Sequence, residues 1–130
     1  PVEAVTQFCL RHAYWSTWTD AIAMQRLVIA LAPRFPRYAH LMYTQAMQRA
    51  EQVLANYIGD RFPANPFPPF GTALGLARFL LYGVSGERRF LALLDAEPAY
   101  PPPTSDTPFA DLPEENTIRA LIALFLGKPS

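Results

Sequence analysis

Apolar residues recur three and four positions apart along almost the whole chain, which is the spacing of a helix that buries one face. No stretch alternates apolar and polar residues for long, so the pattern indicates no strand. Prolines gather in two patches, at residues 63–69 and 98–113, where we expect loops. The pattern therefore predicts an all-α fold, a bundle of about five to six helices.

The first half of the chain is predicted to contain three helices, at about residues 1–17, 18–32 and 36–59. Thr17 and Asp20 have the spacing of a capping box at the start of the second helix. Pro36 suits the first turn of the third helix, and Gly59 suits its left-handed C-cap. The expected buried stripes are Val5, Phe8, Cys9, His12 and Trp15, then Met24, Leu27, Val28 and Leu31, then Met42, Ala46, Ala50, Val53, Leu54 and Tyr57.

A fourth helical segment follows the first proline patch. Residues 72–82 are apolar nearly all round and need cover on more than one side. Gly83, Ser85 and Gly86 then interrupt the pattern, which resumes at residues 88–95. The interruption predicts a kink or a stop.

The last predicted helix ends at about Leu126, and Gly127 closes it. Asp111 and Glu114 have capping-box spacing at its start, with Pro113 in the first turn. Its apolar stripe is expected at Ile118, Leu121, Ile122 and Phe125.

Composition narrows the class of protein. The chain of 130 residues is long enough for one domain with a sizeable core, and 51% apolar against 17% charged residues excludes a disordered segment. Eleven basic and eleven acidic residues cancel, so nothing steers this chain toward nucleic acid. Apolar runs such as residues 27–32 are too short to span a membrane, and the single Cys9 cannot form an internal disulfide. We expect a cytoplasmic domain without membrane contact.

The residues offer little chemistry for catalysis. Cys9 and His12 share a helical face, but a free cysteine on an apolar stripe is usually a core residue. The acidic residues of segment 95–115 are explained by capping and solvation. A glycine-rich phosphate loop and a zinc ligand set are lacking. The sequence therefore predicts no enzyme, no catalytic residue, no metal and no cofactor.

Aromatic and methionine side chains gather at residues 12–18 and 38–47. One interpretation is simple core packing. The other, which the clustering favours, is a cavity for an apolar small molecule, with hydrogen bonds from His12 and Tyr43. The expected ligand-binding residues are His12, Trp15, Trp18, Met24, Tyr38, Met42 and Tyr43.

A family resemblance lies in residues 25–36, which read QRLVIALAPRFP, followed by residues 39–43 and 56–58. These segments resemble the C-terminal domain of TetR-family transcriptional regulators, in which two prolines bracket the turn from the sixth helix to the seventh. Similarity to the eighth and ninth helices of the family is found at residues 79–83, 90–94 and 117–126. Counted in this way, the resemblance covers nearly the whole chain.

The resemblance implies a regulator of two parts. An N-terminal helix-turn-helix domain that reads operator DNA would precede this chain and is expected to be missing from it, because the first residue is Pro1 rather than methionine. The first four helices would enclose an effector cavity, and the last two would form a homodimer interface. The expected interface residues are Leu76, Phe79, Leu80, Phe90, Leu93, Ile118, Leu121, Ile122 and Phe125.

Three departures from the family pattern stand out. Residues 62–70 are unusually rich in proline and phenylalanine, residues 84–86 read as a short insertion, and Leu31 replaces a glutamate that is usual in the subgroup. These departures affect the rim of the expected cavity and the eighth helix.

The function that follows is that of the effector-binding and dimerisation domain of a TetR-family repressor, spanning residues 1–130. Binding of an apolar or aromatic small molecule would alter operator binding by the helix-turn-helix domain. Two alternatives remain: a helical carrier of small molecules without a DNA-binding role, and a dimerisation module with a filled core.

Overall fold

The computed structural model describes residues 1–63, 69–102, 112 and 114–127 of the chain. All named elements in these ranges are helical, and their β pairing is limited to one isolated bridge between Trp18 and Tyr100. The predicted all-α fold is confirmed. The elements are α1 (Val2–Thr17), α2 (Thr19–Leu31), α3 (Pro36–Met42), the π-helical turn η1 (Tyr43–Met47), α4 (Gln48–Arg61), α5 (Ala73–Leu93) and α6 (Glu115–Leu126).

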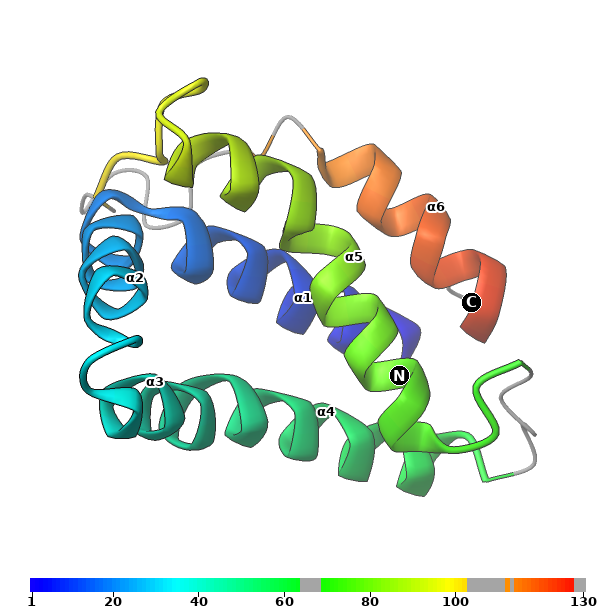
Figure 1. Cartoon of the computed structure of the whole chain (residues 1–130). Helices are drawn as coiled ribbons and strands as arrows, with labels where there is room; N and C mark the ends of the chain where they lie inside the picture. The colour runs from blue at the N-terminus through cyan, green and yellow to red at the C-terminus, as the bar shows by residue number, and fades with distance from the viewer. Residues whose placement is uncertain (64–68, 103–111, 113, 128–130) are drawn as a thin grey trace.

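The helices α1 and α5 lie in the middle of the molecule, with α4 on one side of them and α6 on the other (Figure 1). The elements α3, η1 and α4 follow one another without a break and form one long rod. The helix α2 closes one end of the bundle, where it contacts α1, α3 and α5. None of the helices in the described ranges combines the length and the apolarity needed to cross a bilayer.

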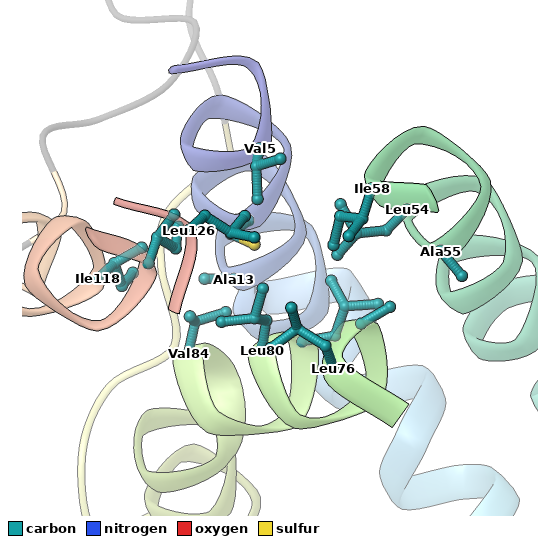
Figure 2. Packing of buried hydrophobic residues seen from close by; sticks show 14 of the residues in the cluster. Val5, Ala13, Leu54, Ala55, Ile58, Leu76, Leu80, Val84, Ile118 and Leu126 are labelled. Carbon is teal, nitrogen blue, oxygen red and sulfur yellow. The ribbon is translucent and has the colours of Figure 1, made fainter. Parts of the chain in front are cut away.

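The core lies where α1, α4, α5 and α6 meet (Figure 2). Cys9, Ile58, Leu80 and Ile122 each come from a different one of these helices, and each is 0% exposed. Burying an aliphatic side chain such as Ile58, Leu80 or Ile122 stabilises the fold by roughly 1.5–3 kcal/mol. This contact among α1, α4, α5 and α6 is therefore a main source of the stability of the domain.

The break between α1 and α2 has a cause other than the predicted capping box. Thr17 is fully buried at the end of α1, and no side chain caps the start of α2. Trp18 is extended instead, and the segment around Tyr100 docks beside it: the Tyr100 amide donates to the Thr17 carbonyl and the Thr19 amide donates to the Tyr100 carbonyl, both at 3.0 Å. A distant segment of the chain thus pairs with the backbone at the break between the two helices, where a capping box was expected.

The buried face of α2 also differs from the predicted stripe. Val28 is buried as expected, but Met24 and Leu27 are more than half exposed, and Leu31 is half-buried. Because α2 lies at the end of the bundle, only a narrow strip of it is covered. That strip consists of Ile22, Gln25 and Val28.

The predicted third helix is confirmed from its proline start at Pro36, but it extends past Gly59 to Arg61. Gly59 is not in the left-handed conformation, so it caps nothing. The π-helical turn adds one residue to a turn and shifts the phase of the buried stripe. Val53 is therefore more than half exposed, whereas Leu54 and its neighbours Glu51, Ala55 and Ile58 are buried.

The two predicted segments after residue 72 form a single helix of 21 residues, α5, with no stop between them. Thr72 caps it, because its hydroxyl accepts from the Gly75 amide at 3.0 Å. Ser85 remains compatible with the helix because its hydroxyl donates to the carbonyl of Leu81 at 2.8 Å. Residues 84–86 are ordinary helical positions and not an inserted loop.

The last helix ends as predicted. Gly127 has a φ of 88°, a backbone conformation that glycine adopts without strain, and the chain leaves α6 there. Ile118 and Ile122 are buried on its inner stripe, as expected. Asp111 and Pro113, two residues of the predicted start, lie outside the described residues.

Candidate functional site

A cavity of about 330 Å³ lies at the end of the bundle, where α2 faces α1, the rod and α5. This volume falls within the usual range for small-molecule sites. The three methionines of the chain all line it, beside Trp15. The lining consists of His12, Trp15 and Ser16 of α1, Ala21, Met24 and Gln25 of α2, Met42 of α3, Ala46 and Met47 of η1, and Arg89 of α5.

The π-helical turn explains how the rod presents two methionines to the same cavity. Met42 and Met47 are five residues apart, which would place them on different faces of a regular α-helix. In η1 the Gln48 amide donates to the carbonyl of Tyr43, five residues earlier, so the turn is wider. Met42 and Met47 consequently lie on one side of the rod.

A more open groove of about 520 Å³ continues from this cavity between α2 and α3. Met24 and Met42 line both spaces and form their common wall. The groove is apolar, with Leu27 and Leu31 on one side and Leu41 with Tyr38 on the other. The two spaces together therefore offer room for a molecule longer than one aromatic ring.

One end of the cavity is polar, and Gln25 organises it. The Gln25 amide nitrogen donates to the carbonyls of Ser16, at 2.7 Å, and Ala21, at 3.0 Å. These bonds leave its oxygen facing Arg89, whose Nη1 donates to it at 3.0 Å. Gln25 thus links α1, α2 and α5 and fixes the position of the Arg89 guanidinium.

His12 lies at the same polar end. Its Nε2 is buried and has no hydrogen-bond partner among the described residues. Burial, with a further contribution from the positive charge of Arg89, lowers the pKa of His12 to about 4, although Glu51 opposes the shift. The ring is therefore neutral at pH 7.

This shift predicts a pH dependence of stability that substitution of His12 removes. The folded pKa lies below the unfolded value of 6.5, so the unfolded chain binds the proton more tightly, and stability is lost as the pH falls from about 6.5 to 4. The shift corresponds to roughly 3 kcal/mol at full burial, and we expect about 2 kcal/mol because the ring is only partly buried. Urea unfolding at pH 7 and pH 4.5 should show a smaller loss in His12→Gln than in the wild type. Equal losses in both chains would contradict this assignment.

Glu51 of α4 is the most buried carboxylate in the described part of the chain, at 1% exposure. Its Oε1 accepts from the Tyr82 hydroxyl at 2.7 Å, and its Oε2 accepts from Arg78 Nε at 3.2 Å and from the Tyr43 hydroxyl at 3.3 Å. Burial and the bond to Glu51 raise the pKa of Tyr82 to about 12. The carboxylate is thus fully partnered and ties the rod to α5.

The geometry does not support nucleophilic chemistry at Cys9. Its side chain is 0% exposed, and burial raises the pKa of the thiol to about 12. Across the described ranges, no three His, Cys, Asp or Glu side chains lie close enough together to bind a metal ion.

Comparison with protein families gives one match. Residues 3–63 match the C-terminal domain of AefR-like transcriptional repressors. This part of the chain is therefore similar to a TetR-family C-terminal domain. Comparison with curated proteins and with solved structures gave no match.

The matched range covers α1 to α4, including the segments 25–36, 39–43 and 56–58 that suggested the family. The matched family consists of C-terminal domains of transcriptional repressors. The similarity noted for α5 and α6 lies beyond the match and stays a prediction.

The structure brings together five of the seven predicted ligand-binding residues. His12, Trp15, Met24 and Met42 line the cavity, and Tyr38 lines the groove. Trp15, predicted on the buried stripe of α1, is 43% exposed, and Tyr14 is buried in its place.

The other two predicted residues lie elsewhere. Trp18 packs edge-on against Trp15, with ring centroids 5.2 Å apart, and does not line the cavity. The Tyr43 hydroxyl is engaged with Glu51. Sequence reasoning missed Gln25 and Arg89, because the contact between them joins positions 64 residues apart and no local pattern reveals it.

The predicted dimer-interface residues divide into two groups. Leu76, Leu80, Ile118 and Ile122 are at most 2% exposed within the single chain, so they cannot present a surface to a partner. The physical reason is that α5 and α6 each use one stripe to build the core. The members that reach the surface in part or in full are Phe79, Phe90, Leu93, Leu121 and Phe125.

The outer stripe of α5 is apolar along its length. Phe79 is 42% exposed and Phe90 60% exposed, and Tyr82 lies between them. At Gly86, on the same stripe, an added Cβ would meet no atom within 4 Å, so a neighbouring helix could approach closely. At one end of the stripe, Phe79 packs with Phe70 and Phe125 at centroid distances of 4.8 and 5.5 Å.

Proposed function

We propose that this chain is the effector-binding and dimerisation domain of a TetR-family transcriptional repressor, and that an apolar or aromatic small molecule is its effector. Operator DNA would be bound by an N-terminal helix-turn-helix domain outside this chain. The family match supports the regulatory role. The observation on which the effector assignment rests is the methionine-walled cavity between α2, α1, η1 and α5.

The position of α2 suggests how a ligand would act. It contributes Met24 and Gln25 to the cavity and contacts the rest of the bundle along a narrow strip. At its C-terminal end the Phe35 amide donates to the Leu31 carbonyl at 2.7 Å, which joins α2 tightly to the rod. A ligand that fits better when α2 is displaced would shift α2 and the rod together. A coupling of about 1–3 kcal/mol between the two sites is typical of such regulators.

Filling the cavity should abolish ligand binding. The Ala46 side chain faces the cavity from η1, so Ala46→Trp would place an indole in the space. The uncharged fluorophore N-phenylnaphthylamine should bind the wild type with an increase in emission, and its affinity for Ala46→Trp should fall at least about tenfold. Ala120→Trp, on an exposed position of α6, is the matched control and should bind as the wild type does. Equal binding by Ala46→Trp and the wild type would place the effector site elsewhere.

Dimerisation should depend on the outer stripe of α5. We propose that this stripe pairs with the same stripe of a second copy, and a charge at Phe90, its most exposed aromatic residue, would have to be desolvated there. Phe90→Glu is expected to raise the dimer dissociation constant at least about tenfold in sedimentation velocity. Phe35→Glu, at the turn before α3, is the control, because Phe35 is also exposed (46%) but lies off this stripe. A wild-type monomer, or an unchanged Phe90→Glu dimer, would contradict the assignment.

A further inference from the structure

Two side chains at the cavity each carry a buried nitrogen atom that nothing in the described part of the chain satisfies. They are Nε2 of His12, on α1, and Nε of Arg89, on α5. Both side chains line the same cavity. Buried polar atoms without partners are rare in native proteins because each is costly, so His12 and Arg89 make this part of the cavity wall one that favours a polar group of a bound molecule.

The charge at this end of the cavity indicates which kind of polar group a bound molecule should carry. Arg89 forms no ion pair with a described carboxylate, and within the described ranges it donates a hydrogen bond to the neutral oxygen of Gln25. The neighbouring Glu51 does not compensate it, because both Glu51 oxygens already accept from Arg78, Tyr43 and Tyr82. His12 is neutral at pH 7. One carboxylate and two guanidinium groups therefore leave a net charge of +1 in this region.

Desolvation strengthens the interaction of this charge with an anionic ligand. The Arg89 guanidinium lies at the wall of an apolar cavity, and its bond to Gln25 fixes its position. A ligand that covers it would separate it from bulk water. A carboxylate is the planar acceptor that matches the geometry of a guanidinium, and charge-assisted hydrogen bonds are about twice as strong as neutral ones. The neutral His12 ring lines the same cavity and has one N–H group to donate.

The remaining walls of the cavity favour an apolar group at the other end of the bound molecule. Trp15, Met24, Met42 and Met47 present flat and adaptable apolar surfaces, and the apolar groove continues past Met24 and Met42. A molecule with its polar group at Arg89 would therefore extend an apolar body along the methionines.

We propose that the effector is an amphipathic anion, an aromatic or aliphatic carboxylic acid whose carboxylate binds Arg89 and His12 and whose apolar body lies against Trp15 and the methionines. This inference deepens the function proposed above and rests on it, since it presumes that the cavity is the effector site. It makes Arg89 and His12 the residues that determine specificity for a charged headgroup.

The test compares two probes that differ only in charge: naphthoate and naphthamide, substituted at the same ring position. Tryptophan fluorescence would give the affinity of each for the wild type, Arg89→Gln and Arg49→Gln. Arg49 is an exposed arginine of α4 that does not line the cavity, so it is the matched control. Circular dichroism would establish that each variant is folded.

The wild type and Arg49→Gln should bind naphthoate at least about tenfold more tightly than naphthamide. Arg89→Gln should lose this preference while its affinity for naphthamide changes little. Equal affinities in the wild type, or a preference that survives Arg89→Gln, would overturn the anionic headgroup. If both probes bind equally and Ala46→Trp abolishes both, the cavity is a binding site without the anion preference; if neither probe binds, the cavity assignment fails together with the inference.

Discussion

Leu80→Ala should lower the free energy of unfolding by about 3–5 kcal/mol, the largest effect expected of any single substitution considered for this domain. Leu80 is 0% exposed at the centre of α5, within the cluster where α1, α4 and α6 also meet (Figure 2). The methyl groups that are lost would leave a cavity, because helices on both sides of α5 prevent the surrounding core from closing over it. Urea unfolding at a fixed protein concentration measures the change, since dimerisation would otherwise make the midpoint concentration-dependent.

The matched control for this prediction is Leu124→Ala. Leu124 lies on α6 and is 75% exposed, so truncating it removes little buried surface and should change stability by less than about 0.5 kcal/mol. A similar loss in both variants would mean that the core is not centred on α5. It would also weaken the view that the partly exposed members of the predicted interface, and not Leu80, face a partner.

Glu51→Ala is expected to cost about 3 kcal/mol, the second largest effect. The substitution removes a buried carboxylate and leaves the hydroxyl of Tyr82 and the guanidinium of Arg78 without their acceptor. The loss stays near the lower end of the range for broken buried ion pairs, because the Arg78 side chain is 47% exposed and can be rehydrated. Chemical unfolding of the variant and the wild type at pH 7 measures it.

One further variant separates charge from packing at this position, and a second is a control at the neighbouring residue. Glu51→Gln keeps the size of the side chain and an acceptor for Tyr82 but removes the charge, so it should cost less than Glu51→Ala. Gln52→Ala changes the exposed neighbour on α4 and should be nearly neutral. If Glu51→Ala were as stable as the wild type, the bonds from α5 to Glu51 would not hold the rod in place.

The fold was largely predictable because helical periodicity and proline positions are local signals. The proline start of α3 at Pro36 and the end of α6 at Gly127 could be predicted from residue type alone. The start of α2 near Trp18 was predicted correctly, but the capping box was wrong, because the backbone of Tyr100, about eighty residues further along the chain, bonds to Thr17 and Thr19 instead. The prediction was wrong also in the phase of the buried stripe of α4, since no propensity marks the π-helical turn η1.

The site was predictable in part for the same reason. Residues of unusual type on neighbouring helices, such as Trp15 and Met42, could be recognised as a cluster, and the structure places them around one cavity. The polar end could not be predicted, because Arg89 reaches the cavity from a helix assigned to dimerisation and Gln25 is one polar residue in an apolar segment. Their roles depend on the packing of α5 against α2, which only the tertiary structure determines.

The most direct test of the central claim follows the methyl groups of isotopically labelled methionines by nuclear magnetic resonance. The chain has three methionines, and all of them line the cavity, so the spectrum reports on this site and little else. Titration with N-phenylnaphthylamine should shift all three methyl signals with one common dissociation constant, and Ala46→Trp should abolish the shifts. Methyl signals that stay unchanged while the probe's emission saturates would contradict the assignment of this cavity as the effector site.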